Sequence, residues 1–258
     1  MSTELQKFKA LHHASELFVL PNAWDARSAI VFQEKKFSSI GTSSAAVANS
    51  LGYEDGEKMP FADYLFVIKR ILASIQIPLT VDLEMGFGKT NDEIVANIVK
   101  LIEVGVVGIN IEDSMIQASK RLLKDAEKFA KAIKYIKNRL QSQKLELFVN
   151  IRCDTYILNV ENKQKETISR LRQYESTGAD GIFLPCISSE EDIAEAVSNT
   201  KLPLNVMVIP GLPDLERLNE LGVKRVSMGP FMFQKVYNSI GNLSQAITAN
   251  KNVSPILS

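Results

Sequence analysis

Short apolar runs alternate with amphipathic helical segments along almost the whole chain, and this alternation limits the possible folds more than any other sequence feature. Runs typical of buried parallel strands occupy residues 17–20, 37–42, 77–81, 106–111, 145–151, 180–184, 204–209 and 224–228. Segments with helical spacing follow them at 26–35, 61–74, 91–104, 125–140, 163–177, 189–198, 213–221 and 230–248. Repeated units of about 30 residues predict an α/β fold, a (β/α)₈ barrel of the TIM type. We expect residues 1–258 to form one such domain.

The loop after the first strand argues against the main alternative, a doubly wound open sheet. Such a sheet usually has a glycine-rich phosphate-binding loop at this point. This chain instead has Asn22-Ala23-Trp24-Asp25. We further expect an N-terminal helix containing Leu5, Phe8 and Leu11, and a loop of small residues at 43–46 after the second strand.

Composition and charge exclude several classes of function. Thirty basic side chains balance thirty acidic ones, so no overall field favours nucleic acid or an anionic membrane as a partner. No apolar run approaches the length of about 18 residues that a membrane span needs, and residues 1–8 lack the apolar core of a secretory signal. Two cysteines, Cys153 and Cys186, cannot make a disulfide framework. We therefore expect a cytoplasmic protein in a reducing compartment.

Two carboxylates stand at the end of the third expected strand. Asp82 and Glu84 are separated by one residue, and residues i and i+2 of a strand share a face. Gly86 and Gly88 then mark a tight loop leaving the strand. Two acids beside a buried strand are costly unless a cation lies between them. A hard divalent ion, Mg²⁺ or Mn²⁺, fits this requirement.

Other expected strands also end in polar residues. The active site of such a barrel lies at the carboxyl ends of its strands. The fourth strand is followed by Glu112-Asp113-Ser114 and the fifth by Arg152, which can bind a carboxylate or phosphoryl oxygen in a fork geometry. These residues predict a small anionic substrate chelated to a metal.

At these positions the chain resembles the isocitrate lyase/phosphoenolpyruvate mutase superfamily, and in particular its small phosphonomutase-like members. The matching segments are the 82–88 loop, Glu112-Asp113-Ser114, Arg152, Pro21-Asn22-Ala23-Trp24-Asp25, and Ser43-Ser44-Ala45 followed by Ser50-Leu51-Gly52-Tyr53. The similarity extends from about residue 17 to residue 233.

The resemblance implies which residues form the site. A Mg²⁺ would be held, partly through water, by Asp82, Glu84 and Glu112, with Asp55 as an outer acid. The backbone amides of Ser43, Ser44 and Ala45 would hold the carboxylate of a 2-oxo acid, and Arg152 would hold its other anionic end. Two further candidates for substrate binding come from the chain itself: Trp24, as a lid over the site, and Asn205, near the start of the seventh strand. A homo-oligomer, a dimer or tetramer, is implied as well, with the C-terminal helix packed across a neighbouring subunit.

The chain departs from the family on the loop after the fourth strand. The lyases carry Lys-(Lys/Arg)-Cys-Gly-His there, and the phosphonopyruvate-processing members carry Lys-Thr-Asn. Residues 115–123 contain no cysteine and no histidine, so Lys120, with Arg121 beside it, is the candidate for a catalytic cation. We expect residues 114–123 to form a mobile gate over the site.

The resemblance implies a Mg²⁺-dependent enzyme that makes or breaks a C–C or C–P bond next to the enolate of a small 2-oxo acid. A rearrangement like that of phosphoenolpyruvate phosphonomutase is the first hypothesis. Oxaloacetate decarboxylation, or a 2-methylisocitrate lyase-like cleavage without the loop cysteine, is the second. A hypothesis of another class is an inactive barrel that serves as a binding protein, which the missing loop residues motivate. A nucleotide-binding protein is disfavoured because no phosphate-cradling glycine loop is present.

Overall fold

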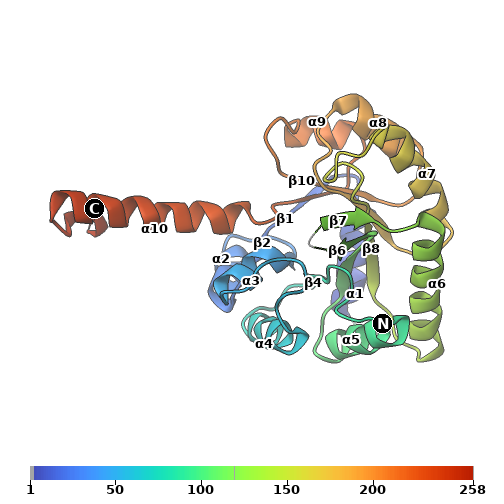
Figure 1. The fold of residues 1–258 in the computed structure, drawn as a ribbon, viewed down its shortest axis with the longest axis horizontal. Coiled ribbons are helices and arrows are strands. Elements are labelled where there is room, and N and C mark those ends of the chain that lie inside the picture. Colours follow the sequence, from blue (N-terminus) through green and yellow to red (C-terminus); the bar gives the residue numbers. More distant parts are fainter. Residues whose placement is uncertain (1–2, 119, 258) are drawn as a thin grey trace.

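Nine parallel strands form one sheet that closes into a barrel (Figure 1). The computed structural model describes residues 3–118 and 120–257. The strands of the sheet are β1 (Phe18–Leu20), β2 (Asn22–Ala23), β3 (Ile40–Thr42), β4 (Leu79–Asp82), β5 (Gly108–Glu112), β8 (Phe148–Arg152), β9 (Gly181–Leu184), β10 (Leu204–Met207) and β11 (Arg225–Ser227). Their order is β1-β11-β10-β9-β8-β5-β4-β3-β2.

The first and last strands of this order are neighbours in the chain, which is why the sheet closes. β1 pairs with β11 and β2 pairs with β3, and only Pro21 separates β1 from β2. Proline has no amide hydrogen to donate to a ladder, so β1 ends before Pro21. β2 lies in the segment after Pro21 that was expected to be a loop. The prediction of a (β/α)₈ barrel is therefore confirmed.

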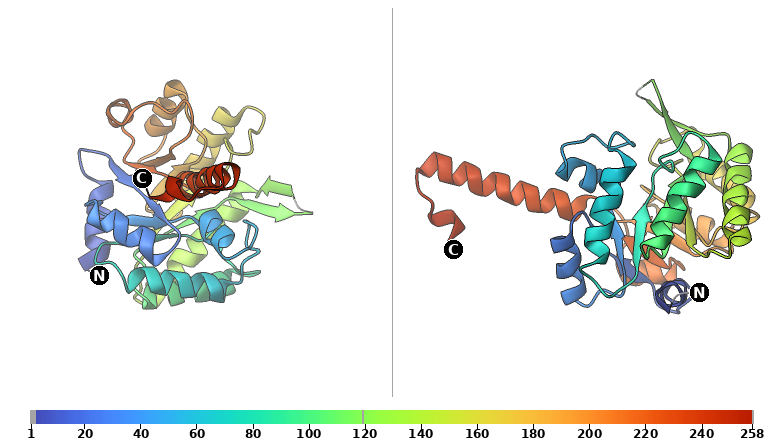
Figure 2. Two further views of the ribbon diagram at one scale, coloured as in Figure 1. Left: turned by 90° about the vertical axis from the view of Figure 1, so that its left-hand side faces the viewer. Right: turned by 90° about the horizontal axis from the view of Figure 1, so that it is seen from below.

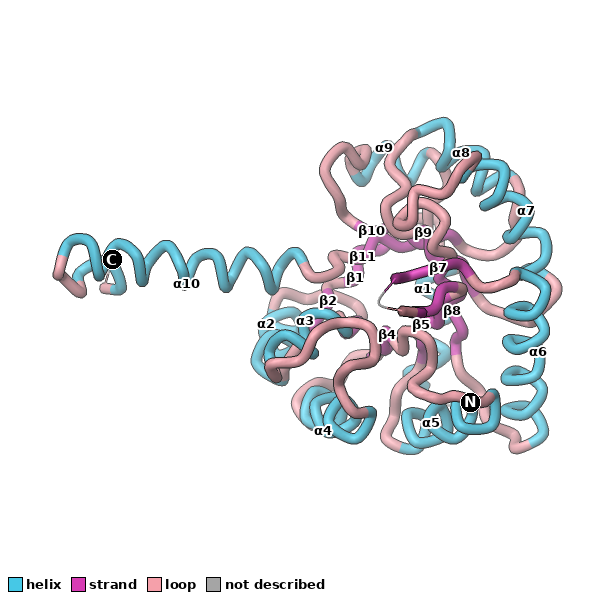
Figure 3. The backbone as a smooth tube through the Cα atoms, in the orientation of Figure 1, coloured by secondary structure: helices cyan, strands magenta, loops and turns pink. Residues whose placement is uncertain are grey.

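Helices other than α10 lie around the sheet (Figures 1 and 3). They are α1 (Thr3–His12), α2 (Ala26–Glu34), α3 (Ser44–Ser50), α4 (Phe61–Leu72), α5 (Asn91–Glu103), α6 (Ala126–Ser142), α7 (Lys163–Glu175), α8 (Glu190–Ser198), α9 (Leu215–Glu220) and α10 (Phe231–Asn250), with the 3₁₀ turn η1 (Ser254–Ile256). Among the described residues no helix combines the length and the apolar character that a membrane crossing requires.

Helix α10 differs from the others because it projects away from the barrel (Figures 1 and 2). None of its twenty residues is buried. Six large apolar side chains on it are 37–50% exposed: Phe231, Met232, Val236, Tyr237, Ile240 and Leu243.

Two loops of the sequence analysis are regular elements in the structure. The expected small-residue loop at 43–46 is wrong, because Ser43 caps α3 by accepting a hydrogen bond from the Ala46 amide. The expected gate at 114–123 is an antiparallel hairpin, β6 (Ser114–Gln117) and β7 (Lys120–Leu123). Ser119 lies outside the described residues.

Helix α1 contributes His12 to the interior at the amino-terminal end of the strands. His12 is only 2% exposed, stacks on Phe148 with ring centroids 4.1 Å apart, and lies 3.4 Å from a guanidinium nitrogen of Arg225. Burial and the charge of Arg225 lower the pKa of His12 well below its ordinary value, although its hydrogen bond to the Phe8 carbonyl acts in the opposite direction. The imidazole is thus neutral in the folded protein near pH 7.

The depressed pKa of His12 predicts acid sensitivity. Below about pH 6.5 the imidazole of His12 is protonated in the unfolded chain but not in the folded chain. The free energy of unfolding therefore falls as pH falls, by about 1 kcal/mol per pH unit, until the pKa of His12 in the folded protein is reached. His12→Gln should flatten the pH dependence of the free energy of unfolding between pH 6.5 and 5, measured by urea titration. His13→Gln is the matched control because His13 is exposed. An unchanged slope in the His12 variant would contradict the assignment.

Candidate active site

The carboxyl ends of three adjacent strands bring the predicted acids and Arg152 to one mouth of the barrel. β4 ends at Asp82, β5 at Glu112 and β8 at Arg152. Glu112 pairs directly with Arg152 in the β5–β8 register, and Asp82 pairs with Asn110 in the β4–β5 register. Because all these strands are parallel, their last side chains meet at the same end. The grouping predicted from the sequence is therefore present.

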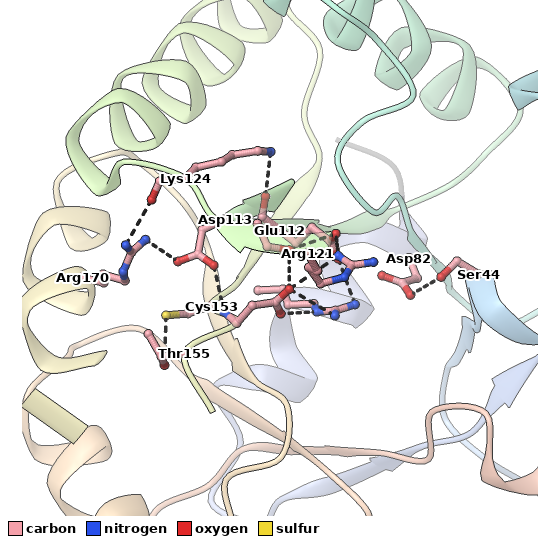
Figure 4. A network of polar contacts seen from close by, with 12 residues as sticks. Ser44, Asp82, Glu112, Asp113, Arg121, Lys124, Cys153, Thr155 and Arg170 are labelled. Carbon is pink, nitrogen blue, oxygen red and sulfur yellow. Dashed lines mark hydrogen bonds and ion pairs between the residues drawn. The ribbon is translucent and has the colours of Figure 1, made fainter. Parts of the chain in front are cut away.

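Glu112 lies between two guanidinium groups (Figure 4). Its carboxylate is fully buried, with Arg152 Nη1 3.0 Å from Oε2. Arg121, from β7 of the hairpin, donates to Oε1 of Glu112 and, at 2.9 Å, to the hydroxyl of Ser114. Burial raises the pKa of Glu112 to about 7 against the lowering effect of the arginines. Glu112 is therefore a buried acid that depends on cationic neighbours to ionise.

Asp154 completes the contacts of the two arginines. Its carboxylate accepts from Arg152 Nε at 2.6 Å and from the Ser114 hydroxyl at 2.5 Å, and it lies 3.7 Å from Arg121. Burial lowers the pKa of Arg152, but the charges of Glu112, Asp154 and Asp82 outweigh this effect and raise it. Arg152 therefore carries positive charge at the mouth.

Asp82 lies at the start of α3. Its Oδ2 accepts a hydrogen bond of 2.8 Å from the Ser44 hydroxyl. The amide of Ser43 donates to the Ala23 carbonyl at 3.1 Å, and the amide of Ser44 donates to Asp82. Of the three amides predicted to bind substrate, that of Ala45 is the one without an acceptor within the described chain.

A second acidic group lies beside Asp82. Glu84, 2% exposed, accepts a hydrogen bond from the Glu57 amide, and Glu57 accepts one from the Phe87 amide. Burial, followed by the charges of Asp55, Asp82, Glu112 and Glu57, raises the pKa of Glu84 to about 9. Asp55 is itself exposed on the loop before α4. So many acids at one place require a compensating cation.

One carboxylate oxygen without a partner indicates where that cation fits. Asp82 Oδ1 is buried and accepts no hydrogen bond from the described residues, whereas Glu112 Oε2 has Arg152 Nη1 3.0 Å away as its partner. Hard carboxylate oxygens are the ligands that Mg²⁺ prefers. No three ligand side chains of the described part of the chain converge on one point. Asp82, Glu84 and Glu112 therefore fit a Mg²⁺ that keeps several waters, rather than a closed protein cage.

Three predicted site residues make contacts other than those with the acids of this mouth. Lys120 is exposed near the tip of the hairpin, and its neighbour Arg121 points into the site instead. Trp24 is buried against Phe233, with ring centroids 5.4 Å apart. Asn205 is the second residue of β10, is buried inside the barrel and accepts a 2.6 Å hydrogen bond from Arg225. Asn205 lies below the mouth because it stands two residues before the carboxyl end of β10.

Sequence reasoning missed Lys124 and Glu57. Lys124 Nζ donates to the Glu112 carbonyl at 3.1 Å and lies 5.2 Å from the centre of the Phe129 ring. Burial lowers its pKa, and the charges of Glu112 and Glu57 partly restore it. No local pattern could assign either residue, because both are brought to the acids by loops. The only available signal was an acid or base close in sequence to an expected strand end.

Asp113 faces away from the mouth and supports it from behind. Its carboxylate is fully buried and accepts from Arg170 at 3.0 Å, from the Tyr174 hydroxyl at 2.7 Å and from the Asp154 amide at 2.8 Å. The link to Asp154 connects α7 with the ends of β5 and β8. Asp113 is thus a positioning residue.

A closed parallel barrel with acids and guanidinium groups at the carboxyl ends of its strands places this protein in the class of α/β-barrel enzymes. The family model described as phosphoenolpyruvate phosphomutase matches residues 8–248. The chain belongs to this family, as the resemblance in the sequence implied.

Individual relatives agree with this membership. The chain is 34% identical over 241 residues to an uncharacterised protein of Mycobacterium tuberculosis (strain H37Rv). The aligned region covers 93% of this chain and 88% of the relative. It is 26% identical over 228 residues to an oxaloacetate decarboxylase of Pseudomonas savastanoi pv. phaseolicola, covering 85% and 76% of the two chains. The crystal structure of a candidate phosphonomutase from Burkholderia cenocepacia J2315 superimposes with a TM-score of 0.88 at 32% identity, covering 95% and 100%.

Proposed function

We propose that this protein is a Mg²⁺-dependent enzyme that makes or breaks the bond next to the carbonyl group of a small 2-oxo acid. The observation that carries the proposal is the electrostatic interaction of Asp82, Glu84 and Glu112 at one mouth, together with two guanidinium groups that contact Glu112. Bound Mg²⁺ would polarise the substrate's carbonyl oxygen and stabilise the negative charge that develops there. Manganese, with similar oxygen preference, is the alternative ion.

The two arginines favour a substrate with a second anionic end. Arg121 and Arg152 both contact Glu112 and both lie near Asp154, so one anion can face both forks. A phosphonate presents three oxygens to such a pair and a carboxylate presents two. We therefore keep a phosphonomutase-type rearrangement of the C–P bond as the first candidate chemistry.

Decarboxylation of oxaloacetate is the second candidate. The hairpin residues 114–118 and 120–123 offer no thiol or imidazole as a proton donor. Loss of carbon dioxide leaves a product that water can protonate, so this reaction does not require such a donor. Similarity to an oxaloacetate decarboxylase over most of the chain supports it.

The assay compares phosphonopyruvate, oxaloacetate and 2-methylisocitrate with and without Mg²⁺. Phosphorus NMR follows the first substrate, and pyruvate release follows the other two, with carbon dioxide as the second product of oxaloacetate and succinate as the second product of 2-methylisocitrate. Turnover of phosphonopyruvate supports the first candidate and turnover of oxaloacetate supports the second. If Mg²⁺-loaded protein left all three unchanged, the proposed substrate class would be wrong.

Binding of oxalate, a mimic of the 2-oxo acid, separates an enzyme from an inactive barrel. We expect oxalate to bind only with Mg²⁺ present, and Asp82→Ala to abolish this binding in titration calorimetry, because the substitution removes an acceptor that Mg²⁺ needs. Asp180→Ala is the control, since Asp180 pairs with Lys137 on the outer side of the barrel. Oxalate binding by the Asp82 variant at wild-type affinity would contradict the site.

We further propose that the enzyme is a cytoplasmic homo-oligomer, a dimer or tetramer. The exposed apolar side chains of α10 support an oligomer, because twenty residues of an unburied, partly apolar helix cost solvation free energy in a monomer. Packing of α10 across a second copy would cover them. The two free cysteines are consistent with a reducing compartment.

A further inference from the structure

A layer of polar side chains fills the barrel directly beneath the mouth. Asn110 stands two residues before Glu112 on β5, and Asn150 stands two residues before Arg152 on β8. A rise of about 3.3 Å per residue puts this layer roughly 7 Å below the acids. Asn150 donates to Asn110 at 2.8 Å and lies 3.4 Å from Asn205. Barrel interiors are usually filled with branched apolar residues, so this layer requires an explanation.

Arg225 of β11 is at the centre of the polar layer. It is fully buried, and its Nη2 donates to Asn110 at 2.8 Å and to Asn205 at 2.6 Å. Its Nε has no acceptor, and no carboxylate within the described ranges forms an ion pair with it. The histidine beside it, His12, is neutral. Arg225 is therefore a buried positive charge with no counter-charge beside it.

The charge of Arg225 costs free energy to bury, and its electric field acts on the residues around it. Burial lowers the pKa of Arg225 to about 9, which leaves the guanidinium charged at neutral pH. The other buried arginine, Arg170, has Asp113 as its partner. Coulomb interactions reach further in a low-dielectric interior than in water. The positive field of Arg225 therefore extends to the mouth above it.

The mouth has a charge imbalance that this field offsets. Six carboxylates surround it, from Asp55, Glu57, Asp82, Glu84, Glu112 and Asp154. Three cationic side chains accompany them, from Arg121, Lys124 and Arg152. The carboxylates thus outnumber the cationic side chains, and a positive charge beneath the mouth offsets part of their repulsion of an anionic substrate.

We propose that Arg225 is an electrostatic positioning residue that raises the affinity of the metal-loaded site for dianionic substrates from beneath the barrel mouth. The inference rests on the proposed function and specifies its substrate class, because the field of Arg225 favours a dianion over a monoanion. The same field opposes binding of the metal alone. Removing the charge should thus change the two affinities in opposite directions, which loss of a merely structural contact would not do.

Two variants remove the charge in different ways. Arg225→Gln deletes it and keeps an amide donor for the asparagines. Asn110→Asp neutralises it, and Asn110 Oδ1 already accepts the two hydrogen bonds that the new carboxylate would accept. Asn110→Asp should raise the melting temperature because it gives Arg225 a partner. Arg225→Lys keeps the charge but changes the hydrogen bonds. Lys137→Gln removes one positive charge on the outside of the barrel and is the matched control.

The measurements are calorimetric titrations of Mg²⁺ alone, then of oxalate and of pyruvate at saturating Mg²⁺. In both charge-removing variants we expect Mg²⁺ to bind several-fold more tightly, oxalate about tenfold more weakly and pyruvate about threefold more weakly. Arg225→Lys and Lys137→Gln should stay within about twofold of wild type, as expected when charge is retained or distant.

The outcomes distinguish this inference from the proposed function. If wild-type protein binds oxalate but Asn110→Asp binds it equally well, the inference is overturned and the function stands. If the charge-removing variants bound both Mg²⁺ and oxalate more weakly, Arg225 would be a structural residue. The same conclusion would follow if Arg225→Lys lost as much oxalate affinity as Arg225→Gln. If Arg225→Gln fails to fold, Asn110→Asp and Arg225→Lys decide the question. If wild-type protein binds no oxalate with Mg²⁺, both proposals fail.

Discussion

Replacing Arg170 by methionine is expected to lower the free energy of unfolding by about 3–5 kcal/mol, because it leaves a fully buried carboxylate without its charged partner. Arg170 is 5% exposed, and its Nη1 lies 3.0 Å from Asp113. Burial already raises the pKa of Asp113 despite its hydrogen bonds. Without Arg170 only the Tyr174 hydroxyl and the Asp154 amide would stabilise the ionised form. Urea-induced unfolding followed by tryptophan fluorescence and circular dichroism measures the change.

An exposed ion pair provides the comparison for this experiment. Lys131 and Glu127 are paired at 2.6 Å on α6, with both side chains 72% exposed. Lys131→Met removes a cation from that pair and should leave the unfolding midpoint unchanged, because exposed pairs contribute little. The double variant Asp113→Asn/Arg170→Met should recover part of the loss, since it removes both charges together. A cost below about 1 kcal/mol for Arg170→Met would mean that Asp113 is not held as an ion.

Arg121→Met is expected to reduce kcat/KM at least a hundredfold, whereas Lys120→Met should leave it unchanged. Arg121 reaches from β7 to Glu112 and Ser114, and it has only 19% of its side chain exposed. A charge-assisted contact to substrate of about 3 kcal/mol corresponds to this factor. Lys120, one residue earlier, is exposed. Steady-state assays on whichever substrate proves active measure both variants.

Because Lys120 and Arg121 are adjacent, the two variants test which of them is the cationic residue of the site: Lys120, as assigned from the sequence, or Arg121, as assigned from the structure. A loss in Lys120→Met with little change in Arg121→Met would restore the assignment of Lys120 made from the sequence. Arg121→Lys should recover only part of the activity, because an ammonium group cannot replace a planar fork. Equal unfolding midpoints for the three variants would show that the losses arise from the site.

Much of the site follows from the sequence because a parallel barrel has simple geometry. Once the strands are assigned, their carboxyl ends must lie at one mouth, and Asp82, Glu112 and Arg152 stand at three such ends. The two-residue period of a strand then places Asn110 and Asn150 on the same side, one layer lower. No long-range contact has to be known for these inferences.

Residues outside the strands could not be placed in this way. Residues 43–46 were expected to be a loop, but Ser43 acts as a helix cap and its amide bonds to Ala23 on another strand. The hairpin at 114–123 was expected to be a mobile loop, and its pairing selects Arg121 over Lys120. A shift of one residue in a strand reverses the direction of its side chains, so the choice depends on a register that only the folded loop specifies.

The sequence by itself determined the barrel, its family and the strand-end residues that mark the mouth, because periodicity and strand ends are local properties of the chain. The tertiary structure alone decided which charges neutralise one another. It paired Asp113 with Arg170, brought Arg121 to Glu112, and left Arg225 buried among three asparagines without a counter-charge. Such pairings join residues far apart in the chain, and their energies depend on burial and distance, which exist only in the folded protein.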